Sequence, residues 1–174
     1  MICFSRKPER YSVMLKSSIG LLLLTLLTAT PVWSQALTPD AQAALGSALQ
    51  DERHAEAFYS AVMAKFGGAR PFSNIIEAER QHEAMLIDLY ATYGVAVPEN
   101  GYASGTLVSP AAPDTLLDAC KIGVEAEIAN RDLYDVTLLP AVAAYPDITL
   151  VMQRLRDASE ENHLPAFQRC VDRG

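Results

Sequence analysis

Four stretches of the chain place apolar residues at helical spacing, and helix-breaking residues fall between them. The patterns predict four long helices, over residues 38–67, 71–93, 114–139 and 146–170. Within each stretch the apolar positions recur in steps of three and four residues, which places them on one face of a helix. No stretch alternates apolar and polar residues in the way of a half-buried strand. The sequence therefore predicts an all-α protein.

The ends of the first two helices are marked by capping and stopping residues. Thr38 offers a capping hydroxyl before Pro39, which suits the first position of a helix, and Gly67 and Gly94 are typical helix stops. The connection over 95–113 is rich in Pro, Gly and Ser, so we expect a long loop there. Two antiparallel hairpins joined by one long crossover form the layout of ferritin-like four-helix bundles. This is the fold class that we expect.

Two prolines bear on the third and fourth helices. Pro140 is expected to end the third helix. Pro165 follows His163 by two residues and removes a backbone donor inside the fourth helix. We expect the fourth helix to kink or end at that point.

Every predicted helix also carries acidic or imidazole side chains on its apolar face. The first and third helices each have a glutamate followed seven residues later by a tyrosine, namely Glu52 with Tyr59 and Glu127 with Tyr134. The second and fourth helices each have a Glu-x-x-His pair on the face that should be buried. The candidate site residues are Glu52, Glu79, His82, Glu127, Glu160 and His163.

This set of residues matches the ligands of di-iron and di-manganese carboxylate bundles, in which two helices each supply a Glu and two supply Glu-x-x-His. A spacing of three places Glu and His side by side, so that the carboxylate can bridge two metals while the imidazole binds one of them. Taken singly, each residue could instead lie on a solvated face or pair with Arg80, Arg131 or Arg154. Four buried carboxylates without counter-charge are costly, whereas two divalent cations neutralise them. The sequence predicts two metal ions, with iron favoured and manganese open.

Four residues beside this set have other expected roles or stay open. His54 is two residues from Glu52, on nearly the opposite face, so we expect it to be exposed. Glu56 lies one turn beyond Glu52 and stays open as an extra ligand or as a hydrogen-bond partner of a ligand. Tyr59 and Tyr134 are interpreted as core aromatics rather than redox groups. The sequence identifies no catalytic residue beyond the metal ligands.

The N-terminal residues 1–36 have the pattern of a signal peptide. Basic residues precede an apolar run over 19–27, and small residues stand at the minus-three and minus-one positions before residue 37. The run is shorter than the roughly 20 residues that span a bilayer, so we expect cleavage and no membrane anchor afterwards. A single domain over 37–174, exported to the periplasm or the cell exterior, would remain. Met14 is an alternative start that leaves this interpretation unchanged.

The acidic charge limits the possible partners. The full chain has 14 Lys and Arg against 21 Asp and Glu, and without residues 1–36 it has 10 against 20, a net charge of −10. A balance of this kind argues against nucleic acid or an anionic membrane surface as partner. It suits a protein that attracts cations.

Two cysteines of the predicted domain are placed for a disulfide. Cys120 lies seven residues before Glu127, and Cys170 lies seven residues after His163. Because the two helices of a hairpin run antiparallel, both cysteines should lie at the same level, about 10.5 Å from the ligands. Export supplies an oxidising compartment, so a Cys120–Cys170 bond is expected. The alternative is two buried thiols acting as small apolar residues.

Several segments resemble known ferritin-like proteins. Two of them resemble the first two helices of rubrerythrin-type members of the superfamily: Glu52-Arg-His-Ala-Glu-Ala-Phe-Tyr59 and Ala78-Glu79-Arg-Gln-His82. Two are similar to a bacterial ferritin-like family named domain of unknown function 2202: Phe72-Ser-Asn-Ile-Ile-Glu-Ala-Glu-Arg-Gln-His82 and Ser159-Glu-Glu-Asn-His-Leu-Pro-Ala-Phe167. The resemblance covers about 41–170. It implies an up-down-down-up bundle and a metal-ligand role for all six candidate residues.

The resemblance to rubrerythrins has two departures. Rubrerythrins carry a further Glu directly after a glycine of the third helix, whereas here Gly123 is followed by Val124. The chain also has no Cys-x-x-Cys module of the rubredoxin type, which delivers electrons in those proteins.

The ligand set and the resemblance together predict an oxidoreductase of ferroxidase or peroxidase type. Its di-iron centre would react with oxygen or peroxide, and its electrons would come from a donor that the sequence does not identify. The alternative is a non-catalytic metal-binding or stress-related structural or interaction protein, in which the metals stabilise the bundle. Both need the same ligands.

Overall fold

The computed structural model describes residues 35–174, and in this part of the chain it contains helices but no strand. The all-α prediction is therefore confirmed for this part of the chain. The predicted signal peptide lies outside the described residues, apart from its last two positions. Between residues 35 and 174, no helix has the length and apolar character needed to cross a membrane.

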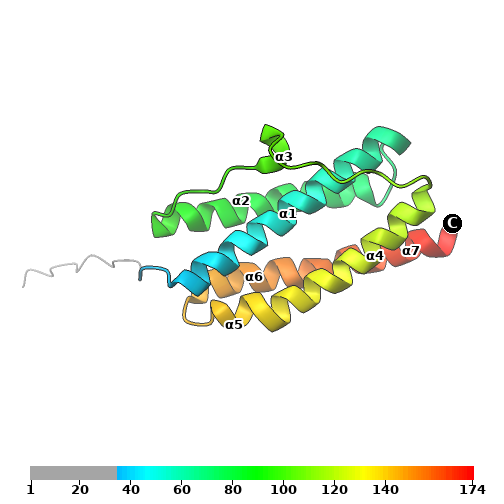
Figure 1. Ribbon diagram of the computed structural model, residues 1–174. Coiled ribbons are helices and arrows are strands. Elements are labelled where there is room, and N and C mark those ends of the chain that lie inside the picture. The colour runs from blue at the N-terminus through cyan, green and yellow to red at the C-terminus, as the bar shows by residue number, and fades with distance from the viewer. Residues whose placement is uncertain (1–34) are drawn as a thin grey trace, which may run out of the picture. The chain divides into compact units, whose positions relative to one another are not determined.

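Helices α1 (Pro39–Phe66) and α2 (Phe72–Tyr93) form the first hairpin (Figure 1). The Thr38 hydroxyl accepts a hydrogen bond from the Ala41 N–H at 3.2 Å, which satisfies a free donor of the first turn. Gly94 ends α2 in the left-handed conformation, with φ of 64°, which glycine adopts without a steric penalty.

A long crossover leads from α2 to the second hairpin and passes along α1 (Figure 1). It contains one short helix that the sequence pattern does not predict, α3 (Gly101–Ser104), capped by the Asn100 side chain. Two cations of α1 hold the crossover in place. Arg53 donates to the Pro98 carbonyl at 2.9 Å, and Lys65 donates to the Pro113 carbonyl at 2.7 Å.

The second hairpin consists of two helical rods, and each contains one π-helical segment. The first rod comprises α4 (Leu116–Leu133), η1 (Tyr134–Leu138) and α5 (Leu139–Ala141). The second comprises α6 (Pro146–Ala158), η2 (Ser159–His163) and α7 (Leu164–Arg173). In Figure 1, α1, α6 and α7 run in one direction, and α2 and α4 run in the other.

Each of the two prolines lies just after a π-helical segment. The first rod ends at Ala141, one residue after Pro140 and close to the predicted end, whereas Pro165 lies in the first turn of α7, so the fourth helix does not end there. In an α-helix the proline ring would clash with the carbonyl four residues earlier. Here each proline directly follows a wider turn, in which Leu139 donates to the Tyr134 carbonyl and Leu164 donates to the Ser159 carbonyl. The extra width accommodates the proline, and at Pro165 the helix continues to Arg173.

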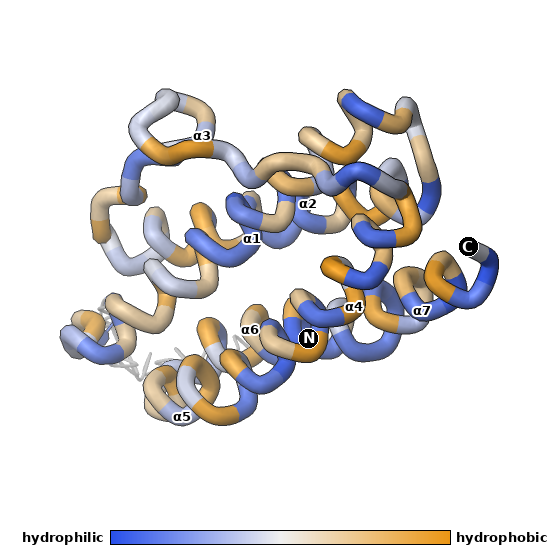
Figure 2. The backbone as a smooth tube through the Cα atoms, turned by 45° about the vertical axis from the view of Figure 1, so that its right-hand side comes forward, coloured by the Kyte–Doolittle hydropathy of each residue, from blue (hydrophilic) through white to orange (hydrophobic). Residues whose placement is uncertain are grey.

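The apolar core is divided into two clusters along the length of the helices. One cluster joins the N-terminal half of α1 to the C-terminal half of α2, with η1 and α6. The other joins the C-terminal half of α1 to the N-terminal half of α2, with α4 and α7. Figure 2 shows hydrophobic and hydrophilic stretches alternating along the long helices, as expected for helices with one apolar face. Along α1, α2 and each rod of the second hairpin, the candidate site residues lie between the members of one cluster and those of the other.

A close helix contact and a disulfide fix α4 against α7. A Cβ at Gly123 would lie 2.6 Å from the ring of Phe167, so only glycine allows this approach without a shift. Cys120 and Cys170 form a disulfide with a Cα–Cα distance of 5.9 Å, as the sequence predicts. The bond lies in the second apolar cluster.

Candidate metal centre

Five of the six candidate residues converge in a buried layer between the two apolar clusters. They form two groups of three, and the ligand atoms of each group lie within 4.8 Å of one another. The first group is Glu52, Glu79 and His82, and the second is Glu79, Glu127 and His163. All five side chains are buried. Glu79 belongs to both groups.

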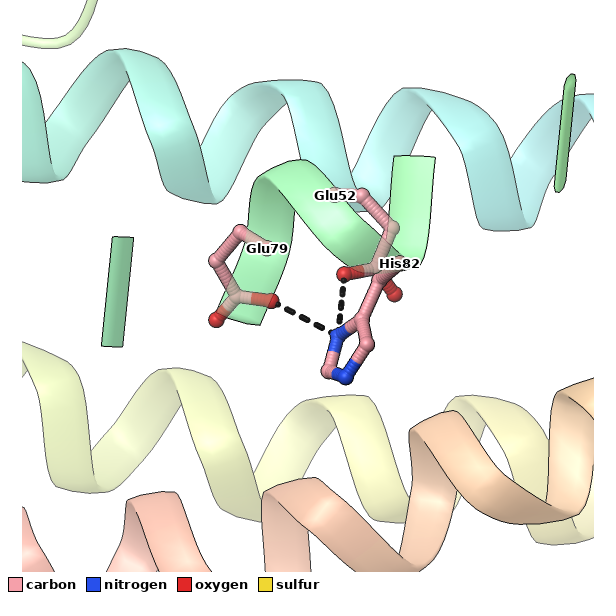
Figure 3. A group of neighbouring side chains, drawn as sticks. All are labelled: Glu52, Glu79 and His82. Atoms are coloured by element: carbon pink, nitrogen blue, oxygen red, sulfur yellow. Dashed lines mark hydrogen bonds and ion pairs between the residues drawn. The ribbon is translucent and has the colours of Figure 1, made fainter. Parts of the chain in front are cut away.

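The first group joins helices α1 and α2, as Figure 3 shows. His82 Nδ1 lies 3.0 Å from Glu79 Oε2 and 3.1 Å from Glu52 Oε2. Glu79 and His82 are neighbours on α2 because residues three apart share a helix face. Glu52 faces them from α1. Their oxygen and nitrogen atoms point toward one another within the layer (Figure 3).

The second group joins α2 to the second hairpin. His163 Nδ1 lies 3.3 Å from Glu79 Oε1 and 3.6 Å from Glu127 Oε1. The two oxygens of the Glu79 carboxylate therefore face different histidines, one from each group. The rings of His82 and His163 are stacked with their centroids 5.7 Å apart.

Two buried tyrosines connect the halves of the site. Tyr59 of α1 donates a hydrogen bond to Glu127 Oε1 of α4 at 3.0 Å. Tyr134 of η1 donates to Glu52 Oε1 of α1, also at 3.0 Å. The Glu-to-Tyr spacing of seven residues thus makes two crossed bonds, in which each tyrosine fixes the glutamate of the other hairpin. The tyrosines are core aromatics that also orient the carboxylates.

Glu160 does not join the cluster, which corrects the sequence expectation. Its carboxylate is partly exposed and forms an ion pair with Arg156, one turn earlier. The cause is the wider turn of η2, because residues three apart no longer share a face there. Ser159 occupies the inward position instead. It is buried and donates a hydrogen bond to Glu127 Oε2. A hydroxyl stands where the sequence predicted a fourth carboxylate.

The remaining candidates near the site have partners of their own. Glu56, left open as a ligand, pairs with Arg80 at 2.7 Å and lies outside both groups. His54 is exposed as expected, and its Nδ1 lies 2.8 Å from the Tyr102 hydroxyl of the crossover. Among residues 35–174, the ionic partners of the three clustered glutamates are histidines, with no Lys or Arg among them. The clustered glutamates are therefore not held by internal salt bridges to Lys or Arg.

Asp51 is a residue of the site region that sequence reasoning missed. Asn130 of α4 donates to its Oδ2 from the Nδ2 atom. Burial raises the pKa of the Asp51 carboxyl, a hydrogen bond from Asn130 opposes this, and the charges of Glu79 and Glu127 add to the rise. Asp51 is adjacent to Glu52 in the chain and lies on the flank of the helix face. No spacing rule distinguishes such a position.

The buried charges of the cluster perturb one another strongly. Burial raises the pKa of Glu52 to about 8, against the hydrogen bond from His82. Burial alone would raise the pKa of Glu79, but hydrogen bonds from His163 and His82 outweigh burial and lower the pKa to about 2. Burial alone would lower the pKa of both histidines. Contacts with the glutamates instead raise the pKa of His82 to about 9 and that of His163 to about 10.

These shifts describe a site that attracts positive charge. Each imidazole turns a nitrogen toward the Glu79 carboxylate, whose lowered pKa keeps it ionised. An ionised carboxylate only accepts, so that nitrogen must carry a proton or share a cation with it. A metal ion bound at Nδ1 would take the place of the proton. Buried carboxylates and imidazoles that converge within a few ångströms are suitable ligands for iron, manganese or zinc. The residues therefore fit a metal site, and Glu79 belongs to both of its ligand groups.

A cavity of about 270 Å³ adjoins the cluster. The five clustered residues form part of its lining, and residues of α1, α4 and the crossover form most of the rest. Pro110 and Ala111 belong to the crossover, so this loop covers part of the approach to the site. Asp51 and His54 also line a second hollow on the outer surface of α1, beside Tyr102.

The comparisons with known proteins support the fold alone. The sequence matches no protein-family model and no curated protein. Among solved structures, the chain is similar to hypothetical protein MJ0754 from Methanococcus jannaschii DSM 2661, with a TM-score of 0.67 and 19% sequence identity. The match covers 83% of this chain and 86% of the other. At this identity the likeness supports the all-helical arrangement and carries no function.

Proposed function

We propose that the chain is an exported, ferritin-like four-helix bundle that binds two metal ions and acts as an oxidoreductase on oxygen or peroxide. The observation that carries the proposal is Glu79, whose two carboxylate oxygens face two different histidines. A carboxylate in this position can bridge two ions, and His82 and His163 can each bind one of them. The ligand set is then three glutamates and two histidines, with Ser159 beside it in place of a fourth carboxylate.

The surrounding residues suit redox chemistry at such a site. Tyr59 and Tyr134 hold the two outer glutamates in position, and burial of the layer restricts access of water. Redox-active ions held by Glu52, Glu79, Glu127, His82 and His163 would supply electrons for the reduction of a small oxidant. Iron is favoured and manganese remains an alternative, because carboxylate and imidazole ligands accept both. The electron donor would be a separate molecule.

A non-catalytic role is the second candidate, and one observation favours it. The charged layer lies between the two apolar clusters and includes residues from α1, α2, α4 and η2. Ions bound there would tie both hairpins together and stabilise the fold by mass action. Metal binding would then serve structure rather than turnover.

The test is the reaction of the metal-loaded protein with oxidant. Metal analysis of the isolated protein should give about two ions per chain, and the reduced iron form should change its absorbance within seconds of mixing with oxygen or hydrogen peroxide in a stopped-flow instrument. A loaded protein whose spectrum stays the same with both oxidants would exclude the oxidoreductase and support the structural role. A protein that binds no transition metal would exclude both.

Export has its own test. Expression of the full chain in a bacterial host, followed by cell fractionation and N-terminal sequencing, should give a periplasmic protein that begins at residue 37. A cytoplasmic protein that retains residues 1–36 would contradict this part of the proposal. The result is independent of the metal chemistry.

A further inference from the structure

The cavity beside the cluster is larger than a small oxidant requires. Oxygen and peroxide are comparable in size to one or two water molecules, each of which takes about 30 Å³ in the liquid. An apolar cavity of about 150 Å³ is enough to bind benzene. The cavity of this protein measures about 270 Å³, so it has room for an organic molecule larger than benzene beside the metal-ligand residues.

The walls of the cavity have a definite chemical character. The base is formed by the carboxylates and imidazoles of the cluster. Away from the base, the walls are largely aliphatic and aromatic, and their members come from α1, α4 and α6: Ala55, Phe58, Ile122, Ala126 and Leu155. Pockets for small organic molecules have this composition, with an apolar wall and a few placed polar groups.

One polar group in the wall lacks a hydrogen-bond partner. The Asn130 amide nitrogen donates to Asp51 Oδ2, whereas the amide oxygen, Asn130 Oδ1, is buried and has no partner within residues 35–174. A buried acceptor without a partner costs about 1–3 kcal/mol, so a ligand that satisfies it gains affinity. An amide oxygen accepts and does not donate, so its partner must carry an N–H or O–H group. Two ions bound at the base would balance the charge of the glutamates there, so the largely apolar walls favour a neutral molecule.

We propose that this cavity binds a small, mostly apolar, neutral organic molecule that directs one N–H or O–H donor to the amide oxygen of Asn130. The proposal rests on the proposed function, because it places this molecule beside the metal pair. It extends that function from oxygen or peroxide alone to a site that also holds an organic ligand.

Indole and benzofuran form a matched pair of probes for this site. They share a bicyclic shape that is larger than benzene, but indole carries a ring N–H where benzofuran carries an oxygen. Binding is measured by isothermal titration calorimetry on the full protein with its metal bound, after metal analysis of the same sample. We expect indole to bind about tenfold more tightly than benzofuran, because only indole can donate to the buried amide oxygen.

Two tryptophan variants locate the binding. Ala126→Trp places a large side chain in the cavity wall and should weaken both probes at least tenfold. Ala129→Trp adds the same side chain at an exposed position of the same helix, outside the lining, and should leave both affinities unchanged.

Variants of the polar group test the hydrogen bond. Asn130→Leu keeps the approximate size of the side chain and removes the acceptor, so it should reduce the preference for indole to less than threefold. If this variant does not fold because Asp51 has lost its donor, Asp51→Leu combined with Asn130→Leu removes both polar partners and should show the same loss of preference. Asn74→Leu, at an exposed position of α2, is the matched control and should keep the parent preference.

The outcomes separate this inference from the proposed function. Equal affinity for the two probes in the parent protein, or unchanged binding in Ala126→Trp, would overturn the assignment. If the protein holds metal and reacts with oxidant but binds no indole at millimolar concentration, the organic ligand is excluded and the proposed function stands. If the isolated protein holds no metal and cannot be loaded, the proposed function fails first.

Discussion

Replacing Glu79 should remove both metal ions, whereas replacing either outer glutamate should remove one. Glu79 Oε2 lies 3.0 Å from His82 Nδ1, and Glu79 Oε1 lies 3.3 Å from His163 Nδ1, so each oxygen serves a different group. Glu52 belongs only to the first group and Glu127 only to the second. Changing a glutamate to glutamine keeps its size and removes its charge.

The size of the effect follows from electrostatics. Two unit charges about 4 Å apart interact by about 4 kcal/mol at an effective dielectric constant of about 20. A divalent ion that binds directly to the carboxylate is closer and more highly charged, so this is a lower figure for each ion. Since 1.4 kcal/mol corresponds to a factor of ten, Glu79→Gln should weaken the binding of both ions by roughly a thousandfold or more. Glu52→Gln and Glu127→Gln should each do so for one ion.

Metal analysis after dialysis against a weak chelator measures this directly. We expect about two ions per chain in the parent protein, one in Glu52→Gln and in Glu127→Gln, and none in Glu79→Gln. Glu125→Gln removes an exposed glutamate of α4 and should keep both ions. The reasoning is refuted if Glu79→Gln retains two ions, or if it loses no more than Glu52→Gln does.

Three further predictions concern the supports of the site. Tyr59→Phe and Tyr134→Phe each delete a 3.0 Å hydrogen bond to a buried carboxyl group. Each should lower the unfolding free energy of the metal-free protein by about 1.5–3 kcal/mol, as measured by urea titration. A loss below about 0.5 kcal/mol in both variants would contradict the role assigned to the tyrosines. Replacing both cysteines of the disulfide by serine opens a loop with a sequence separation of 50. The unfolding free energy should fall by up to about 4 kcal/mol by the chain-entropy model, and the metal content should not change. Equal denaturation midpoints for the parent and the variant would argue that the bond does not form. His82 and His163 have their pKa raised to about 9 and about 10, so their contribution to stability is complete below the unfolded value of about 6.5 and is lost as the pH rises through the two raised values. The melting temperature of the chelated protein should fall over that range, while metal affinity should rise with pH because protons compete for the ligands; a chelated protein that gains stability as the histidines lose their protons would contradict the charge assignment.

Regular helical spacing accounts for most of what the sequence predicted correctly. Glu79 and His82 face the core together because α2 is a regular helix over its whole length. Cys120 and Cys170 meet because equal steps along two antiparallel helices lead to the same level. Glu52 followed the same rule on α1. Each of these inferences needed only a constant spacing of about 3.6 residues per turn and the direction of the chain.

The interactions across the site were harder to predict. The crossed bonds from Tyr59 to Glu127 and from Tyr134 to Glu52 depend on which hairpin faces which, and a spacing of seven within one helix does not contain that information. Asp51 likewise depends on Asn130, a residue of another helix. Sequence periodicity identifies the inward face of a helix, but the neighbour of that face is set by packing.

Glu160 shows how a local backbone feature changes the chemistry of a site. The Glu-x-x-His spacing places both side chains inward only on a regular helix. Pro165 favours a wider turn over Ser159–His163. This wider turn brings Ser159, in place of Glu160, inward together with His163. The same arrangement, a wide turn followed by a Leu-Pro pair, occurs at Pro140, where it begins with the inward-facing Tyr134. Both π-helical segments therefore present a hydroxyl to a clustered glutamate, Tyr134 to Glu52 and Ser159 to Glu127. Because a hydroxyl replaces the fourth carboxylate, the buried layer holds three glutamates and is less negative than the sequence suggested.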